Sequence, residues 1–445
     1  MESLPKVYPP SLDFATPERA ELATRRTVSV KPTSGVSVSN ASSSDIVQFR
    51  LPNTGFLAGC YLKATMTGGV ITAGSNADAN SFAVSTGTAH CDRHAPDASW
   101  IRRMVVKSSD GTEMTNVNNY NHYCSIMNRL ENSKEYEGCQ GSILQETPAS
   151  NGNVRNEHMG VVRTALDGDA LATGLAGITL FNGYEEQGRM EQKTNNVRTF
   201  VHQFRAGVLD QSKDYNLPLG LMGSGMTLEL TCEDVNAVYR AKLNAVEGGN
   251  ALDRHPAVGA SIAGYSLTNL ELVCDLVFYA PEVIASLSSK MCSEGLKIVC
   301  ENIRQQANAV PQQSNTVILN THSRSVKSII CGIKNTDDLS NFRREENDYL
   351  YVPTASGSHI DTFQFSVGSE LAPANPIKYG AQSYLELEKA LKPVVGDRFK
   401  ISNSITRANY FKHHKTDAKG GAVANGGCIG GSGVENGSAI FGINL

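Results

Sequence analysis

The 445-residue sequence has few charged side chains and no long apolar run. Charged residues make up 19 %, below the usual quarter, and 40 Lys and Arg against 44 Asp and Glu give a net charge of -4. This balance argues against a surface that tracks phosphates, so we expect no sequence-specific binding of nucleic acid. Without an apolar run of about 18 residues the sequence predicts no transmembrane segment, and its first residues lack the features of a signal peptide.

The ten cysteines include no Cys-x-x-Cys pair, and several lie in apolar, strand-like runs. Without a signal peptide we expect folding in a reducing compartment, where disulfides are rare. All ten are therefore predicted to be free thiols that pack as small hydrophobes. They are Cys60, Cys91, Cys124, Cys139, Cys232, Cys274, Cys292, Cys300, Cys331 and Cys428.

Turn-forming residues are abundant, with 40 glycines and 16 prolines. Residues 60–66 and 226–232 alternate between apolar and polar side chains, and the run 265–279 could span about 45–50 Å as one strand. No series of amphipathic helices separates these segments, so the sequence predicts an all-β fold and not a parallel α/β sheet. Further predicted strands are 45–51, 100–107, 197–208, 296–303, 325–333, 360–367 and 439–445.

Three short helices are predicted at 120–130, from Pro281 onward, and at 383–391. The first and third each follow a strand segment in their own half of the sequence. This layout predicts two similar β domains in tandem, although residue identity between the halves is not apparent. The predicted parts are an N-terminal arm 1–27, a first domain 28–281, a connecting helix 282–292 and a second domain 293–445.

The N-terminal arm and four long polar loops are the segments without a strand or helix pattern. Residues 1–27 contain four prolines and balanced charges, and a disordered tail and an arm docked on a neighbouring subunit remain equal alternatives. Loops longer than about 15 residues are usually functional or face a partner. The four loops are 68–98, 137–196, 240–260 and 416–437.

No pattern in the sequence predicts a catalytic, cofactor-binding or metal site. The densest group of metal-ligating residue types, His90-Cys-Asp-Arg-His94, has no second ligand pair, and we interpret it as an exposed loop. His413-His414 favours a basic surface patch, and Met222-Gly-Ser-Gly225 does not fit the spacing of a nucleophile elbow. The sequence also lacks the HExxH and phosphate-loop motifs. We therefore predict that the protein is not an enzyme and needs no cofactor.

Several weak motifs follow one another in a recognisable order. The first half has Asp45-Ile-Val-Gln-Phe-Arg-Leu-Pro52, then Ala98-Ser-Trp-Ile-Arg-Arg-Met-Val-Val106, a turn at Asp110-Gly111 and the helix 120–130. The second half has Ser323-Arg-Ser-Val-Lys-Ser-Ile-Ile330, followed by Pro376-Ile377 and the helix 384–391. In this order the segments resemble the double jelly-roll major capsid proteins of icosahedral DNA viruses, of the polinton-like virus and virophage type.

The resemblance implies a fold, a function and a set of partners. It implies two tandem jelly-roll sandwiches, with homotrimers of pseudo-hexagonal outline that tile an icosahedral shell. The partners would be neighbouring capsomers, penton proteins and minor capsid proteins, and the protein would be located in the virion after synthesis in the host cell. The arm 1–27 would lie at the base of the shell and tie neighbouring capsomers together.

One departure from the family concerns the second roll. The family continues past the strand at 441–445 with further strands that close this roll, and an unclosed sheet edge is an aggregation hazard unless a neighbour covers it. Processing, an incomplete record and donation of a strand by another chain stay open as explanations.

Two other functions remain as alternatives. A carbohydrate-binding or adhesive β-sandwich would need an exposed aromatic platform, and the single tryptophan, Trp100, lies in an alternating strand with Arg102 and Arg103. An enzyme on a cupin-like scaffold would need clustered His and Glu ligands.

Overall fold

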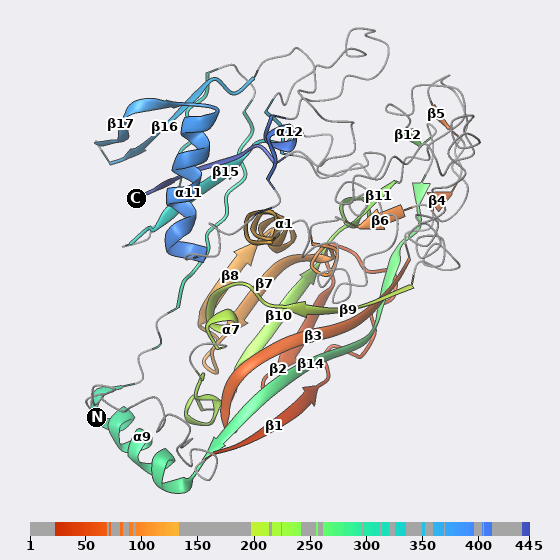
Figure 1. Cartoon of the computed structure of the whole chain (residues 1–445). Helices are drawn as coiled ribbons and strands as arrows, with labels where there is room; N and C mark the ends of the chain where they lie inside the picture. Colours follow the sequence, from red (N-terminus) through yellow and green to blue (C-terminus); the bar gives the residue numbers. More distant parts are fainter. Residues whose placement is uncertain are drawn as a thin grey trace, which may run out of the picture.

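The computed structural model describes most of the two β-rich halves (Figure 1). The described residues are 23–68, 71–72, 81–82, 89–91, 95–132, 197–212, 216–223, 225–241, 255–256, 261–295, 298, 300–310, 314–319, 325–334, 349–351, 359–368, 370–395, 403, 405–411 and 438–445. The predicted loops 137–196 and 416–437 lie wholly outside these residues, as do His413, His414, Cys139 and Cys428.

Eight strands of the first half form two four-stranded antiparallel sheets. The sheets have the orders β1-β14-β3-β9 and β2-β10-β7-β8. Numbered in chain order, the eight strands run 1-8-3-6 in one sheet and 2-7-4-5 in the other, which is the double Greek-key order of a jelly roll. The strands are β1 (Ala23–Val30), β2 (Ile46–Arg50), β3 (Phe56–Gly68), β7 (Ile101–Lys107), β8 (Glu113–Asn118), β9 (Val197–Gln203), β10 (Thr227–Cys232) and β14 (Tyr265–Tyr279).

Alternating side chains place the core of the first half between its two sheets. In β10, Leu228, Leu230 and Cys232 are fully buried, whereas the residues between them are partly exposed. The inward residues of both sheets join one cluster that includes Trp100. The predicted alternation of β3, β10 and β14 is thus confirmed. All eight described cysteines are free thiols, and five of them are buried.

Two boundaries in the first half differ from the predicted ones. β1 begins at Ala23, so residues 23–27 of the predicted arm pair with β14. The predicted strand 197–208 ends at Gln203 and is followed by the short helix α7 (Gly207–Gln211). Gly207 has a φ of +65°, and a Cβ there would lie 2.1 Å from Oγ1 of Thr115, so the chain turns at a position where only glycine fits.

Two of the predicted long loops pair with each other at one end of the first roll. The segment after β3 and the segment before β14 meet in three short ladders, β6·β11, β5·β12 and β4·β13 (Figure 1). These strands are β4 (Ile71–Thr72), β5 (Ser81–Phe82), β6 (Ala89–Cys91), β11 (Tyr239–Ala241), β12 (His255–Pro256) and β13 (Ser261–Ile262).

All three predicted helices are present. They are α1 (Tyr120–Glu131), α9 (Pro281–Glu294) and α11 (Ala381–Val395). The short helices η7 (Leu219–Leu221), α8 (Val235–Val238) and α12 (Arg407–Tyr410) were not predicted. In the part of the chain that the structure describes, no helix combines the length and the apolar character needed to cross a membrane.

The second half contains two described strand pairs and α11. β15 (Ser328–Gly332) pairs with β18 (Ile440–Asn444), and β16 (Thr362–Val367) pairs with β17 (Glu370–Lys378). β15, β16 and β18 confirm the strands predicted at 325–333, 360–367 and 439–445. The prediction of a strand at 296–303 is wrong, because the described residues of this segment belong to no ladder.

Candidate functional site

The densest candidate for a metal site is part of the folded scaffold. His90 and Cys91 belong to β6, which pairs with β11, and Cys91 is fully buried. The interpretation of this segment as an exposed loop is therefore wrong for Cys91, while Asp92 to His94 lie outside the described residues. Among the residues that the structure describes, no three His, Cys, Asp or Glu side chains gather where they could hold a metal ion.

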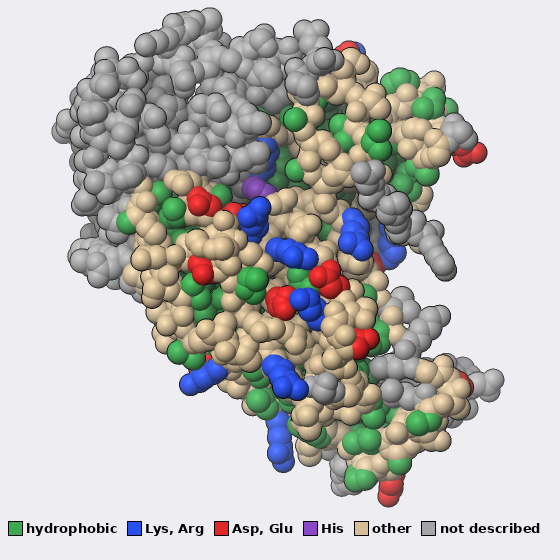
Figure 2. Space-filling model, turned by 180° about the vertical axis from the view of Figure 1, so that it is seen from behind, with side chains coloured by type: hydrophobic (Ala, Val, Ile, Leu, Met, Phe, Trp, Pro, Cys, Tyr) green, Lys and Arg blue, Asp and Glu red, His purple; other side chains and the backbone are tan. Residues whose placement is uncertain are grey.

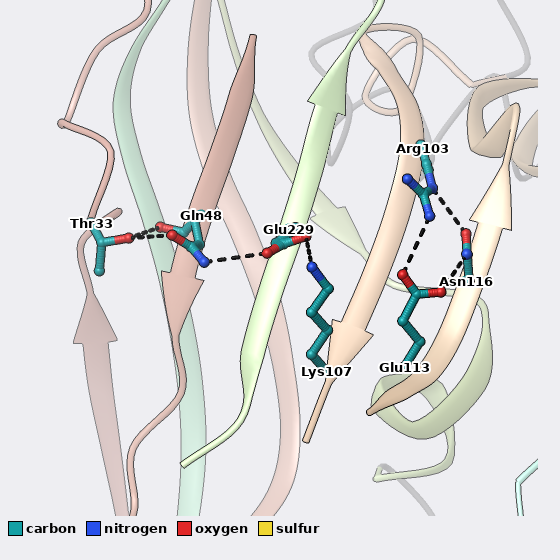
Figure 3. Close-up of polar contacts among 7 residues, drawn as sticks. All are labelled: Thr33, Gln48, Arg103, Lys107, Glu113, Asn116 and Glu229. Atoms are coloured by element: carbon teal, nitrogen blue, oxygen red, sulfur yellow. Dashed lines mark hydrogen bonds and ion pairs between the residues drawn. The ribbon is translucent and has the colours of Figure 1, made fainter. Parts of the chain in front are cut away.

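A line of polar side chains crosses the outer face of the sheet β2-β10-β7-β8 (Figure 3). Glu229 of β10 lies at its centre, where it accepts a hydrogen bond from Gln48 Nε2 at 3.3 Å and one from Lys107 Nζ at 2.6 Å. Thr33 extends the line by donating to the backbone oxygen of Gln48 at 3.1 Å. Lys107 lies opposite Thr227 and therefore diagonally from Glu229. Opposite charges paired across neighbouring strands stabilise the sheet by a few tenths of a kcal/mol up to about 1 kcal/mol.

A second group on the same face pairs β7 with β8. Arg103 Nε donates to Oδ1 of Asn116 at 3.0 Å, and its guanidinium lies 3.5 Å from Glu113. Asn116 also donates to Glu113 at 2.7 Å. Seen from behind, the molecule shows basic and acidic side chains next to one another over its middle (Figure 2). Because Lys107 pairs with Glu229 and Arg103 with Glu113, these four charges cancel locally.

A buried polar triad holds the first turn of α1. Tyr120 Oη lies 3.0 Å from Nε2 of His202 in β9, and His202 Nδ1 lies 2.7 Å from Oδ2 of Asp97. A carboxylate only accepts, so Nδ1 is the donor to Asp97 and Nε2 is left to accept from Tyr120. The backbone N–H of Arg205 in turn donates to Tyr120 Oη at 3.1 Å.

The geometry of this triad suits positioning and not catalysis. All three side chains are less than one tenth exposed, so a substrate has no access to them in this structure. Burial raises the pKa of Tyr120 well above its usual range, which keeps the hydroxyl protonated. The triad therefore acts as a fixed link between α1, β9 and the turn that precedes β7.

The last turn of α1 is fixed to the segment around Arg205, which follows β9. Arg205 forms an ion pair with Glu131 in the last turn, and Tyr123 Oη donates to the backbone oxygen of Arg205 at 3.0 Å. Two turns of the helix are thus fixed to the chain that follows β9.

The C-terminal part of the same apolar face of α1 packs against the second half. Met127 and Leu130 share a buried cluster with Leu387 and Leu391 of α11, Ile440 of β18 and Tyr349. This cluster is a joint between the two halves, because its members come from both.

Cationic side chains from both halves flank one ring in this joint. The guanidinium of Arg129, a fully buried residue of α1, lies 5.0 Å from the ring centroid of Tyr349. Lys334 Nζ lies 4.4 Å from the same centroid and 3.0 Å from Nδ1 of His122 in α1. Arg129 also reaches Oγ of Ser438 at 3.5 Å. Such desolvated cation–π contacts are worth up to about 2 kcal/mol, so the joint fixes how the halves sit.

Sequence reasoning missed the triad and the joint. The residues of the triad are separated by up to 105 positions, and Arg129 and Ser438 by 309. The one available signal was the amphipathic pattern of 120–130, which identified the helix without its partners.

The strand order of the first half defines a jelly-roll β-sandwich, which is followed by a second half with two antiparallel strand pairs. No family model and no curated protein matches the sequence. Among solved structures, the chain is similar to the capsid of the virus PBCV-1, with 10 % identity and a TM-score of 0.44, over 84 % of this chain and 75 % of that one.

Two further solved structures are also similar. The Sputnik virophage structure shows 13 % identity and a TM-score of 0.42, over 95 % of this chain and 76 % of that one. The mavirus major capsid protein shows 11 % identity and a TM-score of 0.31, over 64 % of this chain and 54 % of its own length. The chain thus spans about half of the mavirus protein. The PBCV-1 structure is described as a virus capsid and the mavirus structure as a major capsid protein.

Proposed function

We propose that this chain is a major capsid protein whose homotrimers, of pseudo-hexagonal outline, tile an icosahedral virus shell. The observation that carries the proposal is a complete jelly roll joined through a buried, cation-flanked contact to a second half that contains two antiparallel strand pairs and a helix. A wall subunit has to keep its two sandwiches in one fixed relation, and this joint supplies that relation.

The surfaces of the first roll are suited to contact with copies of the same chain. β14 contains 15 residues, enough for about 50 Å of wall at 3.3–3.4 Å per residue. The outer face of β2-β10-β7-β8 carries charges that are already paired, so a neighbour can approach without leaving a buried charge uncompensated.

A jelly roll alone does not decide between functions, since lectins and cupins also use it. The carbohydrate-binding alternative needs an exposed aromatic platform, and Trp100 is fully buried in the core of the first roll. The capsid proposal includes no catalytic step, cofactor or metal.

The proposal also includes partners and a location. Neighbouring capsomers, penton proteins and minor capsid proteins would contact the trimer in the virion, after synthesis in the host cell. The arm would tie neighbouring capsomers together.

Light scattering coupled to size-exclusion chromatography tests the trimer. We expect a species of about three times 47.8 kDa. A monomer across the micromolar range would contradict the proposal, and stoichiometric glycan binding by a monomer would favour the alternative.

A deletion tests the arm separately. The variant should lack residues 1–22 and not 1–27, because β1 begins at Ala23 and pairs with β14. We expect intact trimers and fewer closed shells in electron micrographs. Normal shell yield from the shortened chain would remove the tying role and leave the trimer proposal standing.

A further inference from the structure

The helix α9 carries an apolar stripe that is only partly covered, at the end of the first roll that lies away from the second half (Figure 1). The stripe consists of Val283, Ile284 and Leu287, which share one side of the helix because they are three and four positions apart. Val283 and Ile284 are half-buried, and Leu287 is 37 % exposed. Among the described residues, none of the three belongs to an apolar cluster of either half. The stripe therefore leaves apolar surface in contact with water.

The ladder between β1 and β14 determines where the N-terminal arm meets the folded chain. The two strands are antiparallel, and Ala23 lies opposite Tyr279. α9 begins two residues after Tyr279, and residues 1–22 precede Ala23 directly. Both segments therefore leave the same end of the sheet, from neighbouring strands that are about 5 Å apart. The arm is thus tethered beside the start of the apolar stripe.

The last part of the arm has the length and the residues to cover the stripe. The 14 residues of α9 span about 21 Å, and seven extended residues span about 23 Å. The seven residues before Ala23 are Thr16-Pro-Glu-Arg-Ala-Glu-Leu22. Pro17 disfavours a helix in this segment, and an extended chain would put Ala20 and Leu22 on one side. The segment can therefore present two apolar side chains to one partner.

We propose that α9 binds residues 16–22 of its own chain. Extended along the helix, Leu22 and Ala20 would cover the apolar stripe, which removes apolar surface of both segments from water. The arm rises about 3.3 Å per residue and the helix about 1.5 Å, so Glu18 would reach the level of Lys290. The apolar side chains and one pair of opposite charges thus agree with a single alignment.

Two other occupants fit the stripe less well. Helices that lie on lipid surfaces are rich in Lys and Arg on their polar face, whereas α9 has Glu282 and Glu294 against Lys290 alone. The arm of a second copy would have to bind from solution. The arm of the same chain is tethered beside the helix, which gives it an effective concentration in the millimolar range.

This contact holds the arm on its own chain before any assembly takes place. The tying role proposed for the arm in a shell then requires that neighbouring copies exchange identical arms, as in domain swapping. The inference concerns the free chain, so it does not depend on the capsid proposal.

Disulfide trapping in the full chain tests the contact. The pair Ala20→Cys and Leu287→Cys places both thiols in the proposed contact. The matched control is Ala20→Cys with Ser289→Cys, which moves the second thiol to the opposite side of α9, because two residues turn a helix by about 200°. Leu287 and Ser289 are both exposed. We expect the intramolecular disulfide to form about tenfold faster in the first pair, measured on non-reducing gels and by peptide mapping.

Limited trypsin digestion provides a second readout that needs no added cysteine. Cleavage after Arg19 requires the arm to leave the helix, so its rate follows the population of the released arm. Leu287→Glu should speed this cleavage by about fivefold or more, because it places a charge in the apolar stripe. Ser289→Glu adds the same charge on the opposite side of α9 and should cleave at the rate of the parent chain.

Three results would overturn the inference. Equal disulfide rates in the two cysteine pairs would mean that the tether alone brings the arm to α9. Disulfide-linked dimers as the main product of the first pair would make the arm of a second copy the occupant. Equal cleavage after Arg19 in the parent chain and in Leu287→Glu would mean that the stripe does not hold the arm. None of these results changes the trimer expected from light scattering, so the inference and the capsid proposal fail separately.

Discussion

The first roll and the described part of the second half differ in how much of their apolar surface is buried. Phe49 of β2 is fully buried between two four-stranded sheets, whereas Phe365 of β16 is only partly buried beside a two-stranded one. A strand pattern therefore determines which side chains face inward. The central strands of both sheets determine whether those side chains are covered.

The largest expected effect comes from replacing one phenylalanine by alanine in each of the two cores. Phe49→Ala should destabilise the first roll by about 3–5 kcal/mol, because it removes a fully buried ring. Phe365→Ala should cost about 1–2 kcal/mol, because less of this ring is removed from water. Urea unfolding of both variants and the parent chain measures the difference. Equal losses would mean that the core of the second half is as closed as the first.

Thiols removed from water in both halves make the stability depend on pH. Burial raises the pKa of Cys232 and of Cys274 in the first roll to about 12, and that of Cys331 in the second half to about 11. An unfolded thiol loses its proton near pH 8.5, so the folded state binds more protons than the unfolded state above that pH. Stability is then complete below about pH 8.5 and falls as the pH rises, by about 1.4 kcal/mol per pH unit for each thiol.

Cysteine variants measure this slope. Between pH 9 and 10.5, Cys274→Ala should make the loss of stability with pH shallower by about 1.4 kcal/mol per unit. Cys292→Ala, at an exposed position of α9, should leave the slope unchanged. Urea midpoints across this pH range provide the measurement, and an identical slope in the parent chain and in Cys274→Ala would contradict the assignment.

The closed first roll was also the easier part to predict from sequence. β10 and β14 alternate clearly because each is covered on one face and paired on both edges. β1 was not predicted, since almost all of its side chains are exposed and its ladder with β14 alone defines it.

Sequence patterns did not predict the polar contacts that connect α1 to the rest of the molecule. The contacts of Tyr120 and of Arg129 join residues that are far apart in the chain, and no periodicity reports such pairs. The segment around Ile303 has a strand-like sequence, but its described residues form no ladder. Whether such a segment pairs depends on the position of other strands, which its own sequence does not report.

Hydrogen bonds at the starts of α1 and α11 allow a second comparison, with a loss of stability of intermediate size. Tyr120→Phe should cost about 1–3 kcal/mol, because Nε2 of His202 and the N–H of Arg205 lose their partner inside the core. In the second half, Tyr410 Oη lies 2.7 Å from Oγ of Ser383 near the start of α11. Tyr410→Phe should cost about 1 kcal/mol or less, because Ser383 keeps its bonds to Gly380. Thermal unfolding of both variants checks the order, and a larger loss in Tyr410→Phe would reverse it.

A further comparison concerns the joint itself. Tyr349→Leu should cost about 1–2 kcal/mol, because it removes the ring that Arg129 and Lys334 flank and leaves a similar apolar volume. Tyr349→Phe keeps the ring and serves as the matched control, with a loss below about 1 kcal/mol. Denaturant unfolding should show a single transition for the control and a transition split between the halves for Tyr349→Leu, because the joint couples them. If both variants unfold alike, the ring does not hold the halves together, and the apolar contacts of Met127 and Leu130 with α11 carry the coupling instead.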